Sequence, residues 1–539
     1  MADKKSGVYY SLTDNSIRLG GGSGFGGVVP MYTMKGPVGE LISVTAQDYR
    51  DKLGYDLEYN PGYLGLDTML ASVVRLNVLR MNINPAIGWR AWKRSGSTLT
   101  DNDSPGFGGS TPPIFYSVDE IAFEDFDIWV AHKTPGHWGN FGVRFKELES
   151  GDYILEYAER KSGDSYYKPN QYYFSLDPAA DNYYEKVNFG DLVLGFYQGS
   201  DPQAPDPASF PEGFPFYETP PETVVNPPSG YVLIANGDNG FVDGDTIDSK
   251  VYVLANDLSQ RLVPIDKLSC DNVVVLNNFT QDSFLVKKFV EYCAKQDRSV
   301  LIDYPGYVKA QDTSALDAGE AIAWVNENNL LMDGGQYGQV IAGSDLVSDG
   351  VKDLAVPPSA YLFQVYAKMY ANYGNTNYPP AGFTYGAVTA SRLRETNFGS
   401  WGDELKTSRI NYLTSGSRGV CIWEQRTLYN LGTSDLSYAN TVFILRDLKL
   451  RIIDFMEGYN FRYTTPIDLL NIQSGLTSIL DYFRNSYFLV NYALKVPTYE
   501  EAQAAGRNLD IDIKVSVISD AEVITIRVGL ENAANLRAA

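Results

Sequence analysis

The stretch that decides the fold runs from Val273 to Asp303 and reads VVVLNNFTQDSFLVKKFVEYCAKQDRSVLID. It opens and closes with apolar runs, Val273–Leu276 and Ser299–Asp303, each of a length that suits one strand. Between them, near residues 281–296, apolar side chains recur at helical spacing. Continuous apolar strands on either side of a helix form a β-α-β unit. The stretch therefore predicts a mainly parallel sheet.

The same alternation is predicted on the N-terminal side, with a strand at Leu41–Val44, a helix near residues 62–75 and a strand at Leu76–Met81. Residues 86–230 differ, because they are rich in Gly, Pro, Asp and Tyr and show few helical patterns. We interpret them as an inserted, mainly-β domain, with a proline-rich loop or edge at 200–229. The chain is thus predicted to leave its α/β domain and to return to it after residue 230.

The last third of the sequence is predicted to be helical and then extended. Apolar residues from Leu445 to Phe455 form a stripe at helical spacing. Thr465-Pro466 and Thr498 begin two further helices, the second of which Gly506 ends. Apolar and polar residues then alternate over 509–517 and again over 523–528, which predicts a sheet with one face in water. Two alternatives remain open for these strands, an internal hairpin or pairing with a neighbouring subunit. Their inward positions include Ile511, Ile513, Val515, Ile524, Ile526 and Val528.

The N-terminal residues contain a second candidate linking strand. Val8, Tyr9, Tyr10 and Leu12 belong to a short extended segment, and the glycine run of 20–27 separates it from the rest as a flexible tether. This run contains a formal G-x-G-x-x-G pattern, but the sequence after it is extended. A dinucleotide loop needs a helix there, so we disfavour nucleotide binding.

Composition narrows the class of function. The chain of 539 residues has a net charge of −22, which argues against nucleic acid and anionic membranes as main partners. We find no signal-peptide core and no apolar stretch of membrane-spanning length, and we expect the chain to be made in a cytoplasm. Three scattered cysteines indicate thiols rather than a disulfide framework.

Catalytic and metal-binding signals are weak. The two histidines of the chain, His132 and His137, lie five residues apart around a Pro-Gly turn between two expected strands. They suggest a metal site, but no third ligand has a recognisable zinc spacing, so we favour a plain turn with Trp138 packed against it. An acidic loop with Asp238, Asp243 and Asp245 misses the calcium-loop spacing. We therefore expect no cofactor, no metal and no enzymatic activity, although a pair of glycosidase carboxylates is not excluded by composition.

Five motifs, in order along residues 7–428, resemble those of contractile tail sheath proteins of bacteriophages and related injection systems. Ser6, Glu424 and the loop Asn236–Gly240 depart from the family pattern, because proline, glycine and a Gly-Gly-x-Asp-Gly loop are usual there. The matching positions are Gly7-Val8-Tyr9, Lys35-Gly36-Pro37, Pro135-Gly136 with Trp138-Gly139-Asn140, Pro357-Pro358-Ser359, and Trp423 with Arg426-Thr427.

The resemblance implies an α/β and α+β multidomain fold with a mixed-sheet core, an inserted mainly-β domain and extended arms at both ends. It implies a structural subunit that polymerises as stacked hexameric rings around a tail tube and contracts to drive the tube through a host envelope. Its partners would be neighbouring subunits, linked by strand addition, the tail tube protein, and baseplate and terminator proteins. The chain would act in the virion tail, which is assembled in the host cytoplasm. The main rival interpretation is an exported carbohydrate-binding surface protein. An acid-pair glycosidase ranks after it. The expected units are 1–27 (arm and tether), 28–85 and 231–355 (α/β domain), 86–230 (outer β domain), 356–508 (C-terminal core, facing the tube) and 509–539 (C-terminal strands and arm).

Overall fold

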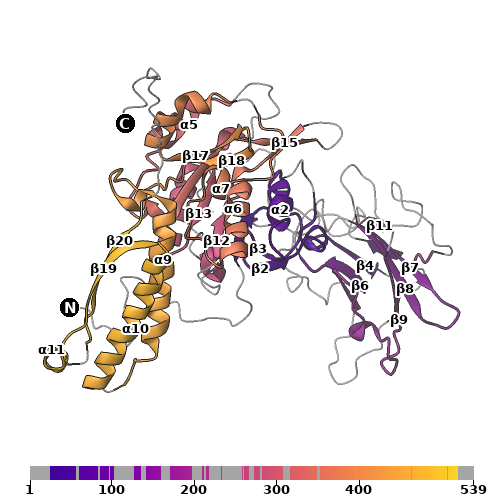
Figure 1. Cartoon of the computed structure of the whole chain (residues 1–539). Helices are drawn as coiled ribbons and strands as arrows, with labels where there is room; N and C mark the ends of the chain where they lie inside the picture. Colours follow the sequence, from indigo (N-terminus) through magenta and orange to yellow (C-terminus); the bar gives the residue numbers. More distant parts are fainter. Residues whose placement is uncertain are drawn as a thin grey trace, which may run out of the picture.

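The computed structural model describes most of the chain between residues 25 and 519 (Figure 1). The residues that it does not describe are 1–24, 56, 58–59, 83–84, 86, 96–97, 102–126, 135–140, 160–169, 197–208, 212–213, 218–231, 234–257, 259, 266–271, 280–281, 308–315, 349–352, 395, 463, 507 and 520–539.

An eight-stranded mixed sheet forms the centre of the molecule. Its order is β18-β17-β14-β13-β12-β1-β3-β2, and neighbours from β17 through β3 run parallel, while β18 and β2 pair antiparallel at the two edges. The predicted β-α-β unit is confirmed as β12, α4 and β13. The strand bounds are β1 Gly26–Met31, β2 Leu41–Val44, β3 Leu76–Arg80, β12 Asn272–Val275, β13 Val300–Asp303, β14 Gly338–Ala342, β17 Ile410–Gly416 and β18 Gly419–Trp423.

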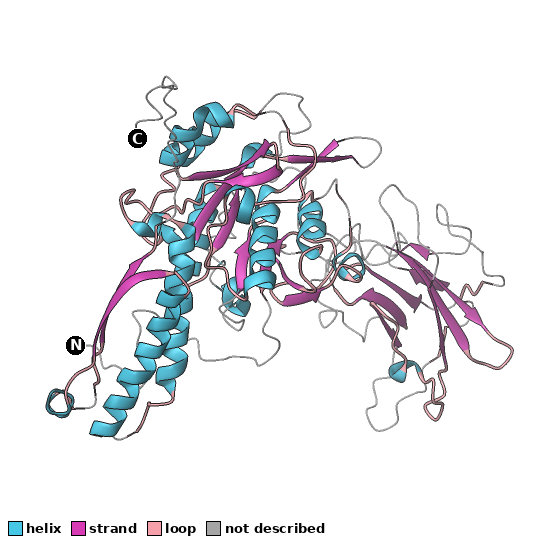
Figure 2. Cartoon of the chain, viewed as in Figure 1, coloured by secondary structure: helices cyan, strands magenta, loops and turns pink. Residues whose placement is uncertain are grey.

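Helices cover both faces of this sheet (Figure 2). Val273 and Val275 point to the face that carries α1 (Tyr49–Leu53), α2 (Gly62–Leu70) and α6 (Pro358–Tyr373). Val274 and Leu276 point to the opposite face, which carries α4 (Ser283–Ala294), α5 (Ala318–Glu327) and α8 (Gly402–Thr407). Burial on both faces explains why these strands read as continuous apolar runs.

Two predicted limits differ from the structure. The tether was expected to reach residue 27, but β1 begins at Gly26 and pairs with β12 and β3. A Cβ atom at Gly27 would lie 2.7 Å from Phe363 Cε2, so this glycine permits close packing against α6 rather than flexibility. The expected boundary at residue 356 does not separate two units either, because β17 and β18 complete the main sheet.

The described residues between 89 and 233 form two small sheets. One four-stranded sheet has the order β10-β6-β4-β5 and the other β11-β7-β8-β9, both antiparallel, and an aromatic cluster that includes Phe145, Phe174 and Phe214 packs between them. β6 and β7, which flank the expected Pro-Gly turn, therefore belong to different sheets, and the turn itself lies outside the described residues. The bounds are β4 Trp89–Ser95, β5 Thr98–Asp101, β6 Ile128–His132, β7 Phe141–Glu147, β8 Tyr153–Glu159, β9 Asn170–Phe174, β10 Leu192–Phe196 and β11 Val232–Leu233.

Residues 439–517 form an arm that projects from the main body (Figure 1). It consists of the helices α9 (Ala439–Glu457) and α10 (Pro466–Asn485), the strands β19 (Leu489–Lys495) and β20 (Asp512–Val517), and α11 (Tyr499–Ala504) between them. Both predicted helix starts are confirmed as capping boxes, at Thr465 and at Thr498. In the described part of the chain, no helix combines the length and the apolar character that a membrane crossing requires.

The remaining short elements join the units described above. They include the hairpin of β15 (Asp345–Ser348) and β16 (Asp353–Val356), the short helix α7 (Gly382–Tyr385), and the 3-10 helices η4 (Tyr184–Lys186), η6 (Gly335–Tyr337), η7 (Phe398–Trp401) and η8 (Asp435–Ser437).

Candidate functional site

The arm carries a small antiparallel sheet made of β19 and β20 alone. The register places Lys495 opposite Asp512 and Tyr492 opposite Val515, with a bulge next to Val490. Within the described residues, the outer edge of each strand has no neighbouring strand. An isolated pair of strands is marginally stable by itself, and unpaired edges are templates for an added strand. The outer edges of β19 and β20 are therefore positions at which a further strand could pair.

One face of the small sheet packs on α10. Leu480 and Phe483 of α10 are fully buried, and they belong to the same apolar cluster as Leu494 of β19 and Val515 of β20. The Tyr492 hydroxyl also donates to Asp481 Oδ1 at 2.7 Å. The alternation predicted for 509–517 is therefore confirmed, with Ile511, Ile513 and Val515 half-buried toward the helices. Their strand pairs with β19, an element that our sequence reasoning missed although Tyr492 and Leu494 alternate with polar or small residues.

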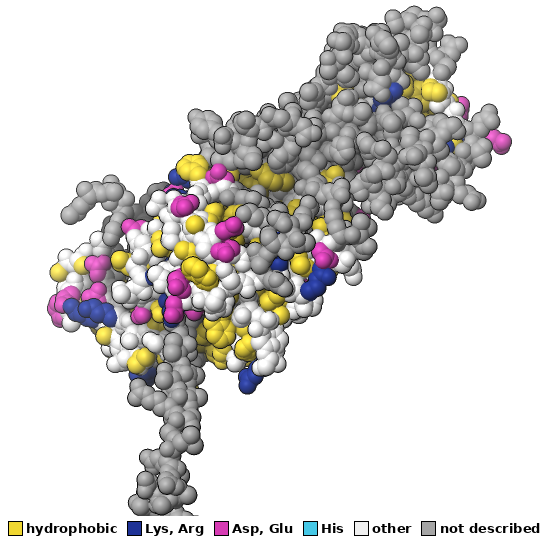
Figure 3. Space-filling view, turned by 90° about the horizontal axis from the view of Figure 1, so that it is seen from above, with side chains coloured by type: hydrophobic (Ala, Val, Ile, Leu, Met, Phe, Trp, Pro, Cys, Tyr) yellow, Lys and Arg dark blue, Asp and Glu magenta, His cyan; other side chains and the backbone are white. Residues whose placement is uncertain are grey.

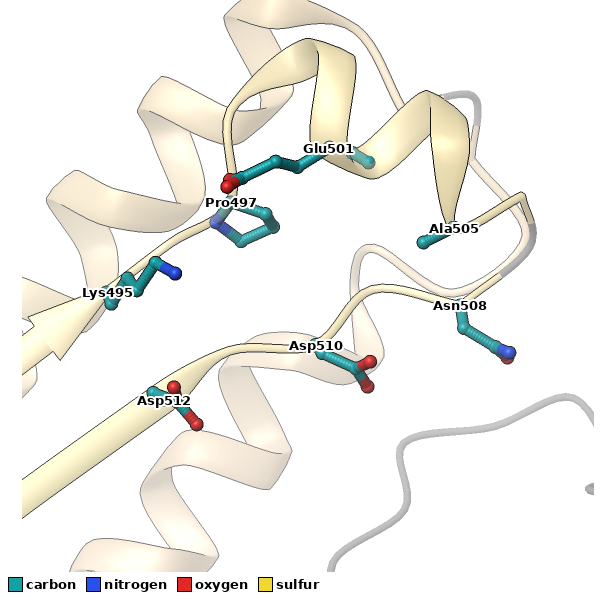
Figure 4. Close-up of a pocket in the computed structure, with 8 residues that line it drawn as sticks. Lys495, Pro497, Glu501, Ala505, Asn508, Asp510 and Asp512 are labelled. Atoms are coloured by element: carbon teal, nitrogen blue, oxygen red, sulfur yellow. The ribbon is translucent and has the colours of Figure 1, made fainter.

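A small cavity closes the end of this sheet (Figure 4). It measures about 220 Å³ and lies between α11 and the segment that leads into β20. Lys495, Glu501, Asp510 and Asp512 line it, and Glu501 is already used because its carboxylate accepts the Thr498 amide at 2.9 Å. No cluster of three metal-ligating side chains occurs among the residues that the structure describes. Polar and apolar atoms line the cavity in similar measure, and its residues form no recognisable catalytic arrangement.

A buried ion pair fastens the arm to the main body. Lys449 of α9 pairs with Asp297, which precedes β13, and Tyr337 donates its hydroxyl to the same carboxylate. Asp297 has a positive φ of 53°, and both charged side chains are nearly buried. Loss of one partner would leave a buried charge uncompensated, which costs several kcal/mol. These contacts therefore tie α9 to the segment that leads into β13.

The motif Pro357-Pro358-Ser359 begins α6, and its role depends on a residue far away in sequence. Asp303, at the end of β13, accepts the Ser359 amide at 2.7 Å and the Ser359 hydroxyl at 2.8 Å. Asp303 therefore caps the helix that covers the sheet. Burial raises the pKa of Asp303 to about 6, although the hydrogen bonds donated by Ser359 and Asn278 act to lower it. These motif residues are structural, and no ligand is needed to explain them.

The motif from Trp423 to Thr427 joins the main sheet to α9. Asn411 of β17 donates to the carbonyls of Val340 and Arg426, both at 2.9 Å, and Thr427 Oγ1 donates to the Leu436 carbonyl at 2.7 Å. The Arg426 guanidinium is buried 4.1 Å over the Tyr438 ring. Trp423, in contrast, is 40 % exposed. The motif therefore connects β17 to the segment before α9. Asn411, which sequence reasoning missed, makes two of the connecting hydrogen bonds.

The histidine turn is described in part. His132 is buried in β6, its Nδ1 lies 2.8 Å from the Thr134 carbonyl oxygen, and burial lowers its pKa to about 4. His137 lies outside the described residues, together with the motif positions Pro135, Gly136, Trp138, Gly139 and Asn140. The candidate linking residues Val8, Tyr9, Tyr10, Leu12, Ile524, Ile526 and Val528 and the acidic loop with Asp238 also lie outside the described residues.

Comparison with known proteins identifies the fold. No protein-family model matches the sequence, and no curated protein matches it. Among solved structures, the sheath tail protein of Desulfitobacterium hafniense aligns over 91 % of this chain and 93 % of its own, with a TM-score of 0.52 and 12 % identity. The chain has the fold of a sheath tail protein.

Two further sheath structures are similar over part or most of the chain. The sheath tail protein of Listeria innocua covers 93 % of this chain and 97 % of its own, with a TM-score of 0.48 and 11 % identity. The contracted helical sheath of the anti-feeding prophage covers 56 % of this chain and 78 % of its own, with a TM-score of 0.38 and 16 % identity. The likeness to the Desulfitobacterium hafniense protein, at 12 % identity, shows the fold alone, and residue roles must come from this chain itself.

Proposed function

We propose that this chain is a structural subunit of a contractile tail sheath. It would polymerise as stacked hexameric rings around a tail tube and contract to drive the tube through a host envelope. The observation that carries the proposal is the β19–β20 sheet. Among the described residues its two outer edges have no neighbouring strand, and an ion pair ties its supporting helix α9 to the main body of a chain with the sheath fold. A structural polymer needs such strong, directional links between copies, and an enzyme does not.

The proposed link is strand addition. The β19–β20 sheet, with Ile511, Ile513 and Val515 packed on α10, would receive strands from neighbouring copies. The donors would be the N-terminal strand around Val8, Tyr9, Tyr10 and Leu12 and the C-terminal strand around Ile524, Ile526 and Val528. A donated strand of roughly five residues adds about five backbone hydrogen bonds, each worth on the order of 1 kcal/mol net. Links of this kind hold while subunits slide and rotate against each other.

The remaining partners follow from the same proposal. The C-terminal part of the chain would face the tail tube, the β domain would lie outside, and baseplate and terminator proteins would bind the two ends of the polymer. The chain would act in the tail of a phage or phage-like particle, assembled in the host cytoplasm, with no role for nucleic acid, membrane or cofactor.

Truncation of the N-terminal arm tests the link. We expect a chain without residues 1–19 to keep the folded core, because the described core begins at Phe25, and to form no long polymers. The measurement is sedimentation velocity with electron microscopy of the pellet. As a point test in the C-terminal strand, Ile526→Pro removes one donor N–H and should also block polymers, whereas Ala533→Pro, beyond the strand, should not. Long polymers from the truncated chain would refute strand addition by this arm.

A further inference from the structure

Arg409 occupies an unfavourable position for a cation. It follows α8 and precedes β17, is 8 % exposed, and adopts a left-handed backbone with φ of 64°. Both features cost free energy, because burial removes the guanidinium from water and a side chain is strained at positive φ. Folding of the free subunit gains little from an arginine here.

No carboxylate compensates this charge in the described part of the chain. The Arg409 side chain makes one long hydrogen bond, from Nη1 to the Lys406 carbonyl at 3.5 Å, and its buried Nε has no acceptor. Glu424 pairs with the neighbouring Arg426. Burial and the neighbouring Arg426 guanidinium lower the pKa of Arg409, and the Tyr438 hydroxyl opposes this shift in part; no carboxylate does. Of the two neighbouring arginines, Arg426 has a carboxylate partner and Arg409 has none among the described residues.

The Nη2 atom of Arg409 lies against Gly432, which is exposed. A Cβ atom on Gly432 would lie 2.3 Å from Arg409 Nη2, so the guanidinium occupies the place that a side chain at position 432 would need. Glycine therefore allows Nη2 to reach the surface loop. Gly432 is exposed and has no positive φ that would require glycine for its own backbone. Leu431, beside it, is 58 % exposed and offers an apolar rim.

We infer that Arg409, reached beside Gly432, binds a carboxylate of a second copy of this chain when subunits assemble. The inference rests on the proposed sheath function, which brings copies into contact. Charge complementarity favours another copy as the occupant, because the chain has 66 acidic against 44 basic residues and this cation has no acid of its own. A guanidinium gains most from a planar carboxylate in a partly desolvated contact.

Two variants and one control separate this role from a structural one. Arg409→Met keeps length and removes the charge, so the melting temperature of the isolated subunit should stay equal or rise. Gly432→Ala places a methyl group where Nη2 lies, so the flexible Arg409 side chain must shift away from the surface, and the fold should stay intact. Both should raise the concentration needed for polymer formation at least tenfold, as expected for loss of a buried charge contact. Gly399→Ala, at a glycine with open space around it and no positive φ, is the matched control and should assemble normally.

The measurements are thermal unfolding of the isolated subunit and pelleting of polymers over a concentration series. The inference is overturned if both variants assemble at the wild-type concentration, or if Arg409→Met lowers the melting temperature and thereby shows a structural role. A wild-type chain that forms no polymer at any concentration contradicts the sheath proposal itself, which is a different result.

Discussion

Glu424 occupies a backbone position that favours glycine. Its φ is 66°, and its carboxylate compensates by pairing with the buried Arg426 Nε at 3.3 Å. A left-handed backbone is the conformation that glycine adopts without strain. In this chain the ion pair and the backbone strain oppose each other at one residue.

Substitution of Glu424 by glycine and by alanine measures the strain. Both variants lose the ion pair, but only glycine relaxes the left-handed backbone, so Glu424→Gly should be more stable than Glu424→Ala by about 1 kcal/mol. Urea unfolding of the two variants gives this difference directly. Equal stability of the two would show that the backbone at this position is not strained.

Asp303 should make stability depend on pH between about 4 and 6. Its folded pKa of about 6 lies above the usual value near 3.9, so the folded chain holds a proton that the unfolded chain releases. Stability from this group is therefore fully present below pH 4 and declines as pH rises to 6, by up to about 3 kcal/mol. Asp303→Asn does not titrate, and its stability relative to wild type should rise over this interval in urea unfolding at a series of pH values. A constant difference between pH 4.5 and pH 7 would contradict the raised pKa.

The sequence predicted where the motif residues lie but not which residues they contact. Pro357, Pro358 and Ser359 were recognised from a resemblance, while the carboxylate that caps them comes from Asp303, 56 positions earlier. Asn411 and Arg409 were missed for a similar reason. Their roles depend on neighbours that the fold brings together, and no local pattern reveals such contacts.

At the level of elements, the arm should unfold separately from the main sheet. Its sheet depends on one face of α10, so Leu480→Ala should cost about 2–5 kcal/mol and expose β19 and β20. Hydrogen exchange should show faster exchange in these strands and unchanged protection in β12 and β13. Leu470→Ala in the same helix is the control, since Leu470 is 65 % exposed and its loss should have little effect. Equal loss of protection in both sheets would show that the arm and body unfold together.

Element types were predictable where local chemistry decides them. Capping boxes at Thr465 and Thr498 placed two helix starts correctly, and apolar runs placed β12 and β13. Gly27 misled the prediction, because a glycine that allows close packing looks the same in sequence as one that allows flexibility. β19 was missed because its partner, β20, lies beyond an intervening helix.

At the level of the whole molecule, charge and assembly must be reconciled. A net charge of −22 makes copies repel each other, although salt screens this repulsion beyond roughly 8 Å. On the face shown in Figure 3, acidic side chains are spread over the described surface with basic ones between them. Backbone pairing between strands does not depend on charge, and it therefore suits a polymer of acidic subunits.

Electron cryo-microscopy of the purified full-length chain tests the central claim most directly. The account predicts tubes or stacked rings with a helical lattice, in which the β19–β20 sheet of each copy carries at least one strand from a neighbouring copy. Dispersed monomers, or a polymer in which both outer edges of the β19–β20 sheet stay bare, would contradict it.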